Sequence, residues 1–377
     1  MIIGIDATEF GIDRGGVRHY IFNLLQSLQE IDKDNIYLVI LHFWKKSMIG
    51  SYTELQCLLT QNNFKLKWIR FPGTIISSWK LPIDLFTGHL DVYHGAGHYV
   101  DRVYHGKTVI TVHDLDYCIV PDLLDKEWVI KKAKFTEISI RRATAVIVPS
   151  NFIKDAILSQ FSIEKDRVFV VHHGVSHTFS PELGKQIVMN TKKKYGIPPD
   201  YILFVGQINR NKNLMRLIEA FNMLKQTHNI PYCLVLAGAK RLFHKELHMR
   251  ITELGLQNDV LLPGYVDEAD LPSLYGGATL FMFPSLYEGF GLPVLEAMAS
   301  GVPVIASSSG SLPEVVGNAG LLVNPLQTEE IAQAMHRLLS DSRLREQLIQ
   351  LGLERARHFS WTSTALKTLN VYKKVSG

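Results

Sequence analysis

A stretch near residue 290 combines loop glycines with two glutamates. It reads Glu288-Gly289-Phe290-Gly291-Leu292 and continues through Pro293, which suits the first turn of a helix, to Glu296. Glycines let a loop backbone approach a ligand closely, and the N–H groups of such a loop can hold a phosphate. A carboxylate on the following helix can accept two hydrogen bonds from a ribose diol. The stretch predicts a binding site of this kind; glutamates on a solvated helix face are the alternative interpretation.

A second candidate stretch carries two cations at the expected start of a helix. Gly206 to Asn213 follows a strand-like run and contains Arg210 and Lys212. The dipole of a helix favours anions at this end, so cations have no structural reason to be there. A bound anion such as a diphosphate would explain them. Solvated surface charge is the other explanation, and the residues alone leave both open.

A third candidate is the glycine-containing segment Gly11 to Gly16. Gly15 and Gly16 precede an amphipathic pattern, so the segment joins the first expected strand to a helix. Such a junction can bind phosphate through free backbone N–H groups. The spacing fits neither the dinucleotide fingerprint nor the P-loop. A phosphate site and a tight turn without a ligand both stay open.

The elements that must position these segments alternate between strand and helix from end to end. The strand-like runs are continuous in Val and Ile rather than alternating, which is typical of strands buried on both faces of a parallel sheet. Strand–helix alternation predicts the α/β class. The expected strands are 1–5, 36–41, 64–70, 92–94, 108–111, 145–148, 168–171, 201–206, 233–237, 260–262, 280–283, 304–306 and 320–323.

The pattern is interrupted once, over residues 178–200, and then restarts. This part is rich in Pro, Gly and Lys, and we interpret it as a domain linker with a connecting helix. The sequence therefore predicts two doubly wound domains. The first comprises residues 1–185, and the family resemblance described below adds to it a C-terminal segment, 360–377, that returns to it. The second comprises residues 186–359.

Composition excludes several classes of protein. The chain has 377 residues, 46% of them hydrophobic and 20% charged, which is typical of a globular protein rather than a disordered one. A net charge of +4 is too small for a nucleic-acid binder, so no nucleic-acid partner is expected. Cys57, Cys118 and Cys233 are expected to be buried thiols in a reducing compartment. No signal-peptide pattern and no long apolar run is visible, which predicts a cytoplasmic protein, at most lying on a membrane surface.

Taken together, the motifs resemble those of a known family. Glu288 and Glu296 form an E-x7-E spacing within EGFGLPVLEAMASG, and Leu312-Pro313-Glu314-Val315 follows. In this order with the other motifs, the chain resembles the family-4 retaining glycosyltransferases of the GT-B fold from about residue 4 to about residue 340. The other motifs are Gly15-Gly16, Val112-His113-Asp114-Leu115, Val148-Pro149-Ser150, His173-Gly174-Val175 and Lys212-Asn213.

The resemblance implies two Rossmann-like domains facing across a cleft and a nucleotide-diphosphate sugar as donor substrate. It implies that Lys212 neutralises the diphosphate leaving group and that Glu296 binds the ribose hydroxyls. Glu288 then contacts the donor sugar, and His113 lies beside the reaction centre. The role of Arg210 is less secure than that of Lys212. The family often has an arginine at the position of Gln207, and Arg210 would have to supply that charge from three residues later. The other implied donor contacts are Gly15, Gly16, Val266, Gly289, Phe290, Gly291 and Leu292.

The donor sugar and the acceptor stay open at this stage. Similarity to bacterial mannosyltransferases of surface-polysaccharide assembly ranks GDP-mannose first, UDP-glucose next and dTDP-rhamnose third. The expected acceptor is a glycan or a lipid-linked oligosaccharide. No residue is an obvious covalent nucleophile, so we expect same-face substitution assisted by the leaving phosphate. A sugar-nucleotide hydrolase or epimerase and a noncatalytic sugar-nucleotide-binding module are the other interpretations.

No metal and no cofactor are expected for this reaction. Asp114-Leu115-Asp116 and Asp32-Lys33-Asp34 are formally DxD motifs, but they lack the context of the fold that uses this signature. His94 and His98 suggest a metal pair, although a structural or acceptor-side role is preferred for them. The basic and aromatic segments 43–46 and 65–80 could meet a membrane or a lipid-linked acceptor, and a solvated face is the alternative.

Overall fold

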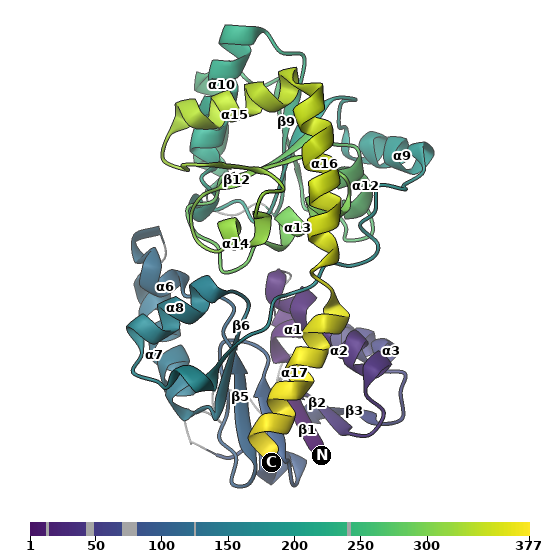
Figure 1. Ribbon diagram of the computed structural model, residues 1–377, viewed down its shortest axis with the longest axis vertical. Helices are drawn as coiled ribbons and strands as arrows, with labels where there is room; N and C mark the ends of the chain where they lie inside the picture. The colour runs from purple at the N-terminus through teal and green to yellow at the C-terminus, as the bar shows by residue number, and fades with distance from the viewer. Residues whose placement is uncertain (13–14, 43–48, 70–80, 124–125, 240–242) are drawn as a thin grey trace. The chain divides into compact units, whose positions relative to one another are not determined.

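The chain forms two compact units. A computed structural model describes residues 1–12, 15–42, 49–69, 81–123, 126–239 and 243–377 (Figure 1). The first unit comprises Met1–Gly174 and Ser360–Gly377, and the second comprises Val175–Phe359. Each unit is built around one parallel sheet, so the predicted α/β class with two Rossmann-like domains is confirmed.

The first unit contains a seven-stranded sheet in the order β3-β2-β1-β4-β5-β6-β7 among the described residues. The chain builds outward from β1 to β3 and then continues from β4 on the other side, so the strand order reverses between β1 and β4. The strands are β1 (Ile2–Asp6), β2 (Ile36–His42), β3 (Phe64–Ile69), β4 (Val92–Gly95), β5 (Lys107–Thr111), β6 (Ala145–Val148) and β7 (Val168–Val170).

The helices of the first unit pack their apolar faces on this sheet. In α2 (Gly16–Ile31), the buried face contains Ile21, Leu24, Leu25 and Leu28, as the helical spacing predicts. The remaining α-helices of the described N-terminal part are α1 (Thr8–Ile12), α3 (Ile49–Leu58), α5 (Asp84–Thr87), α6 (Asp116–Ile119), α7 (Lys126–Arg142) and α8 (Asn151–Gln160), with short 3-10 turns η2 (Pro121–Leu123) and η3 (Lys165–Arg167).

The last helix, α17 (Trp361–Ser376), completes the first unit although it comes from the other end of the chain. It packs against α2 and against β4, β5 and β6, as the yellow helix of Figure 1 shows. Its buried residues include Ala365 and Tyr372, both fully inaccessible. The family resemblance implies a return of segment 360–377 to the first unit, and residues 360–377 belong to that unit.

The second unit contains a six-stranded sheet in the order β10-β9-β8-β11-β12-β13 among the described residues. Here the order reverses between β8 and β11. The strands are β8 (Tyr201–Val205), β9 (Cys233–Ala237), β10 (Val260–Gly264), β11 (Leu280–Phe283), β12 (Val304–Ser307) and β13 (Leu321–Val323). The helices are α9 (Lys185–Tyr195), η4 (Arg210–Lys212), α10 (Leu214–His228), α11 (His244–Glu253), α12 (Leu271–Gly276), α13 (Leu292–Ala299), α14 (Leu312–Val316), α15 (Thr328–Ser340) and α16 (Ser342–Arg357).

The chain passes from the first unit to the second between Gly174 and Val175. The boundary predicted from the sequence lies after residue 185. Val175 and Phe179 pack against the apolar core of the second unit. The N–H group of Val175 also donates to the carbonyl of Phe359 at 3.1 Å. Residues 175–185 therefore belong with the second unit, because apolar packing outweighs their linker-like composition.

The cysteines differ from expectation. Cys57 is exposed, and Cys118 and Cys233 are half-buried, so the prediction of three buried thiols is wrong. No helix in the described part of the chain is long and apolar enough to cross a membrane. Of the two segments considered for membrane contact, 43–46 and 70–80 lie outside the described residues, while Lys65 and Lys67 are exposed on β3.

Candidate functional site

Two of the three candidate segments meet at one edge of the second sheet. Residues 206–213 follow β8 and residues 284–291 follow β11, and these two strands are neighbours at the point where the strand order reverses. In open α/β sheets, ligands bind outside the carboxyl ends of the strands at this switch point. The two segments that the sequence selects separately therefore flank one place.

Asparagine side chains and backbone groups tie these two loops together. The N–H group of Leu286 donates to the carbonyl of Asn211 at 2.8 Å, and Asn211 Nδ2 donates to the carbonyl of Tyr287 at 2.8 Å. Asn213 Nδ2 donates to the carbonyl of Pro284 at 3.1 Å. Asn213 adopts a φ of 58°, in the left-handed region that asparagine tolerates better than most residues. These bonds hold the two loops in one arrangement.

Lys212 and Glu288 form an ion pair between the two loops. Lys212 Nζ contacts Glu288 Oε1, and each side chain is 14% exposed. The side chain of Asn209 accepts a hydrogen bond from the N–H group of Lys212 at 3.2 Å, which fixes the turn that carries the lysine. The ammonium also lies 5.1 Å from the centre of the Phe283 ring. A cation is thus held at the switch point in a place with little water.

Ser311 forms hydrogen bonds with the backbone of the loop that contains Gly289 and Gly291. Its Oγ lies within hydrogen-bond distance of the carbonyls of Glu288, at 3.0 Å, and Phe290, at 2.9 Å. Its N–H group donates to the carbonyl of Glu288 at 3.2 Å. The carbonyl groups of this loop are therefore directed toward Ser311. Sequence reasoning missed this serine, because only the close approach of two separate loops gives it a role.

Gly291 makes the turn from the loop into α13. Its φ is 108°, a conformation that side chains with a Cβ rarely adopt. A Cβ at this position would also lie 2.6 Å from Leu312 Cδ2. Pro293 follows in the first turn of α13, as the sequence predicts. The N-terminus of α13, which attracts negative charge, is thereby joined directly to the loop.

Glu296 lies on α13 and is positioned by a buried tyrosine. Tyr275, on α12, donates its hydroxyl proton to Glu296 Oε2 at 2.8 Å and is fully buried. Burial raises the pKa of Tyr275 well above its usual range, so its hydroxyl stays a donor. Sequence reasoning did not select Tyr275, since nothing in its local pattern distinguishes it from a core aromatic residue.

Neither Arg210 nor Val266 takes part in the Lys212–Glu288 ion pair. The Arg210 guanidinium contacts Glu246 Oε1 and Oε2 on α11 at 2.7 Å and 2.9 Å, and its side chain is 57% exposed. Its charge is therefore already balanced by a surface carboxylate. The Val266 side chain is part of the apolar core, so a ligand could contact this residue only through its backbone.

The predicted residues Gly15, Gly16 and His113 belong to the first unit. A Cβ added at Gly16 would meet nothing within 4 Å, so neighbouring packing does not require glycine there. His113 donates from Nε2 to the carbonyl of Ala96 at 2.8 Å, and its Nδ1 lies 3.4 Å from His173 Nε2. Because the carbonyl can only accept, the proton of His113 is assigned to Nε2.

The DxD motif and the histidine pair have protein partners of their own. Lys132 Nζ contacts Asp114 Oδ1 at 2.7 Å and Asp116 Oδ1 at 2.9 Å, so a lysine ammonium lies between these carboxylates. Burial, together with Asp114, raises the pKa of Asp116 to about 6. His94 shares hydrogen bonds with the Tyr372 hydroxyl at 2.6 Å and with Thr111 Oγ1 at 2.7 Å. Both His94 nitrogens are thus engaged, and a structural role explains this histidine.

Comparison with known families gives matches over both units. Residues 14–179 match the family described as Glycosyltransferase Family 4. Residues 189–355 match the family described as Glycosyl transferases group 1. The two matched regions cover nearly all of the range over which the sequence motifs resemble family-4 enzymes.

Named relatives include two from Escherichia coli. O-antigen chain mannosyltransferase B is 32% identical over 286 residues, which are 73% of this chain and 75% of that protein. Serotype-specific mannosyltransferase WbdA is 32% identical over 292 residues, which are 75% of this chain but 35% of that longer protein.

Solved structures share the architecture over nearly the full chain. Sucrose-phosphate synthase from Thermosynechococcus elongatus has a TM-score of 0.77 at 19% identity, with 99% of this chain and 98% of that chain covered. Anabaena Alr3699/HepE in complex with UDP and glucose has a TM-score of 0.78 at 18% identity, with 99% and 100% covered. Identities this low bear on the fold alone.

Proposed function

The chain belongs to the family-4 glycosyltransferases and has their GT-B fold, and on that premise we propose that it is a retaining mannosyltransferase of polysaccharide biosynthesis. Its donor is GDP-mannose, and its acceptor is a glycan or a lipid-linked oligosaccharide. The donor assignment is supported by the relatives of 32% identity that are named mannosyltransferases. The structural neighbour that holds UDP is 18% identical, too distant to argue for a donor.

One arrangement carries the proposal: the half-buried Lys212–Glu288 ion pair beside the Gly289–Leu292 loop at the switch point of the second unit. Breaking a glycosyl phosphate bond places negative charge on the departing diphosphate. A fixed cation and backbone N–H groups stabilise such charge most strongly where water is scarce. Lys212 is the cation, and the N-terminal end of α13 adds a favourable potential.

The transfer is written as a same-face substitution. The bond between the sugar C1 and the diphosphate oxygen breaks, and a bond forms from an acceptor hydroxyl oxygen to C1 on the same face. The hydroxyl proton passes to the departing phosphate oxygen, and the nucleoside diphosphate leaves. The linkage then keeps the anomeric configuration of the donor. Glu296, held by Tyr275, binds the ribose hydroxyls and so positions the nucleotide.

The proposal is tested with purified full-length protein and three donors: GDP-mannose, UDP-glucose and dTDP-rhamnose. Each is incubated with and without a mannosyl glycoside as acceptor, and release of nucleoside diphosphate is measured. We expect release from GDP-mannose that depends on the acceptor, with Lys212→Ala as the inactive control. The anomeric configuration of the product is read by NMR.

Three results would each overturn part of the proposal. Release without an acceptor would indicate a hydrolase. Release only from UDP-glucose or dTDP-rhamnose would change the donor. An inverted linkage would exclude same-face substitution.

A further inference from the structure

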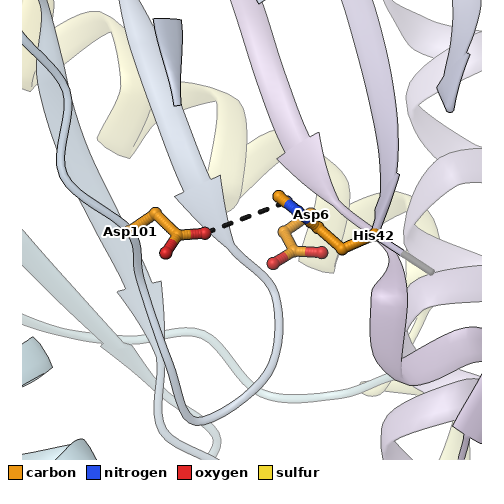
Figure 2. A group of neighbouring side chains, drawn as sticks. All are labelled: Asp6, His42 and Asp101. Atoms are coloured by element: carbon orange, nitrogen blue, oxygen red, sulfur yellow. Dashed lines mark ion pairs between the residues drawn. The ribbon is translucent and has the colours of Figure 1, made fainter. Parts of the chain in front are cut away.

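A second cluster of ionisable side chains lies at the switch point of the first unit. Asp6 ends β1, His42 ends the neighbouring strand β2, and Asp101 lies in the segment after β4, so the cluster lies beside the reversal of strand order between β1 and β4 (Figure 2). One nitrogen or oxygen atom from each side chain lies within 4.8 Å of the others. His42 is 5% exposed and Asp101 is 3% exposed.

His42 is the unusual member of the cluster. Both of its ring nitrogens are buried and lack a hydrogen-bond partner among the described residues. Its Nε2 points at Asp101 Oδ2 across 3.8 Å, too long for a hydrogen bond (Figure 2). Buried polar atoms almost always have a partner in native proteins. The ring is therefore aimed at the carboxylates without being bound by them.

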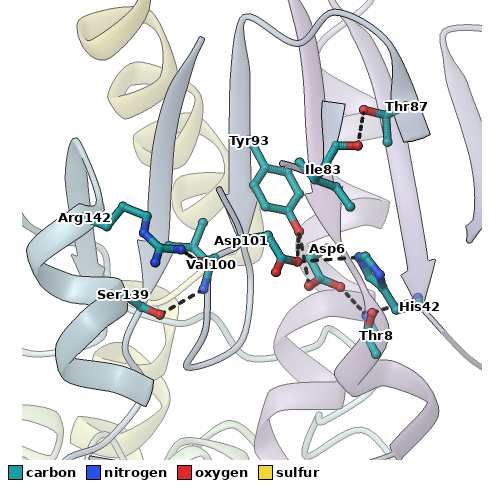
Figure 3. Close-up of polar contacts among 10 residues, drawn as sticks. All are labelled: Asp6, Thr8, His42, Ile83, Thr87, Tyr93, Val100, Asp101, Ser139 and Arg142. Carbon is teal, nitrogen blue, oxygen red and sulfur yellow. Dashed lines mark hydrogen bonds and ion pairs between the residues drawn. The ribbon is translucent and has the colours of Figure 1, made fainter. Parts of the chain in front are cut away.

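The two carboxylates have no permanently charged partner, and among the described residues His42 is the base that pairs with Asp101. In the described part of the chain, no lysine or arginine forms an ion pair with Asp6 or Asp101. The Tyr93 hydroxyl lies 3.4 Å from Asp6 Oδ2 and 3.3 Å from Asp101 Oδ2, and its single proton can serve only one of them at a time (Figure 3), while Tyr99 gives Asp101 a further side-chain hydrogen bond. Two carboxylates this close, one of them buried, repel each other unless a cation joins them.

We propose that Asp6, His42 and Asp101 bind a divalent transition-metal ion of the zinc(II) class. Zinc takes imidazole nitrogen and carboxylate oxygen at about 2.0–2.2 Å, so two ligands of one tetrahedral ion lie about 3.4 Å apart. The 3.8 Å separation of His42 Nε2 and Asp101 Oδ2 is close to this value. The histidine favours a transition metal over Mg²⁺ or Ca²⁺, which prefer oxygen ligands.

The bound ion has a structural role. It connects the carboxyl ends of β1 and β2 to the segment after β4, compensates the two carboxylates and gives the His42 ring its missing partner. The N–H group of Thr8 already holds Asp6 Oδ1 at 2.9 Å, so part of the ligand set is positioned beforehand (Figure 3). No step of the proposed transfer uses the ion. A structural zinc ion in the first unit is therefore compatible with a transfer reaction that needs no metal.

The test uses the full-length protein stripped of metal with a chelator, which is then removed. Zinc chloride is titrated by calorimetry, and thermal unfolding is followed by tryptophan fluorescence. We expect one zinc ion per chain, a micromolar or lower dissociation constant, and a rise in melting temperature through mass action. Co²⁺ in place of Zn²⁺ is expected to give the visible absorption bands of a low-symmetry nitrogen–oxygen site.

Variants separate this site from adventitious binding. His42→Ala and the nearly isosteric Asp101→Asn are each expected to weaken zinc binding by at least about 100-fold, because loss of a direct ligand costs no less than the roughly 10- to 100-fold loss of a residue that only supports a ligand. His89→Ala is the matched control, because His89 is an exposed histidine 3.1 Å from the carboxylate of Asp91. Its zinc affinity is expected to equal that of the wild type. Should His42→Ala fail to fold, Asp101→Asn and the Co²⁺ spectrum decide.

The proposal is overturned by any of three results. The first is a dissociation constant for zinc in the millimolar range. The second is zinc binding that survives Asp101→Asn or disappears in His89→Ala. The third is a preference for Mg²⁺ over Zn²⁺, which would exclude the transition-metal class.

Discussion

Lys212 is the residue on which the proposed chemistry depends most directly. Lys212→Ala is expected to lower turnover by about 100-fold, equivalent to ~3 kcal/mol of lost leaving-group stabilisation. Lys212→Arg keeps the charge and is expected to retain more activity than Lys212→Ala. The measurement is acceptor-dependent release of nucleoside diphosphate.

Lys194→Ala is the matched control for Lys212→Ala. Lys194 is an exposed lysine of the same unit that pairs with Asp267 and Asp270 at 2.8 Å and 2.6 Å. Exposed pairs contribute little to stability, and this lysine has no part in the site. A loss of less than about tenfold in Lys212→Ala would contradict the role of a leaving-group cation.

Glu296 tests the nucleotide-binding part of the site. Glu296→Gln is expected to weaken binding of GDP by about 10- to 100-fold, because charge-assisted hydrogen bonds contribute ~1.5–3 kcal/mol. Tyr275→Phe removes the hydroxyl that holds Glu296 Oε2 and is expected to change affinity in the same direction by less. Calorimetry with GDP measures both variants. Equal affinity of Glu296→Gln and wild type would exclude the ribose contact.

Buried His94 gives the first unit a pH dependence. Burial lowers the pKa of His94 from 6.5 to about 3, so the folded protein keeps this histidine neutral where the unfolded chain protonates it. Above pH 6.5 this histidine is neutral in both states and does not affect the free energy of unfolding. As the pH decreases from 6.5 toward 3, only the unfolded chain binds the proton, so the free energy of unfolding falls by ~1.4 kcal/mol per pH unit. Between pH 7 and pH 5, wild type should lose about 2 kcal/mol more unfolding free energy than His94→Gln.

Urea unfolding by tryptophan fluorescence measures this difference, because residues 175–359, which form the second unit, contain no tryptophan. His105→Gln, at an exposed position, is the control. An identical pH dependence in wild type and His94→Gln would show that this histidine does not titrate between the folded and unfolded states as proposed.

At the scale of the elements, the junction between the Gly289–Leu292 loop and α13 depends on a glycine at position 291. Gly291→Ala places a Cβ at a φ of 108° and 2.6 Å from Leu312 Cδ2. The expected cost is about 1–3 kcal/mol of stability, together with weaker binding of GDP because the loop shifts. Thermal unfolding and GDP calorimetry report the two effects.

Gly184→Ala is the control for this junction. Gly184 precedes α9, has no positive φ, and its added Cβ would meet its first neighbour at 3.8 Å. This variant is expected to leave stability and GDP affinity unchanged. A Gly291→Ala protein with wild-type stability would show that the loop adapts without cost.

For the whole molecule, the division of the chain predicts unequal behaviour of fragments. Residues 175–359 form one unit from a continuous segment, and we expect this fragment to fold alone and to bind GDP. Residues 1–174 lack α17, so the surface that buries Ala365 and Tyr372 would be exposed. We expect this fragment to fold only when residues 360–377 are supplied. Circular dichroism melting curves distinguish a cooperative unit from an unfolded chain.

Much of this molecule follows from local patterns in the sequence. Every strand of both sheets lies within about two residues of its predicted position, since buried parallel strands produce continuous apolar runs. The positive φ and first-turn proline at Gly291-Leu292-Pro293 follow from the glycine–proline spacing. The family follows from motifs in a defined order, and the matches over residues 14–179 and 189–355 confirm it.

The partners of the site residues were decided by the tertiary structure alone. The Tyr275–Glu296 hydrogen bond, the Arg210–Glu246 pair and the Asp6–His42–Asp101 cluster each join residues far apart in the chain. Periodicity shows that a strand exists but not which strand lies beside it. The reversal of strand order, which brings β1 beside β4 and β8 beside β11, comes from the packing of whole elements. Side chains at the ends of those strands therefore meet only once the sheets are assembled.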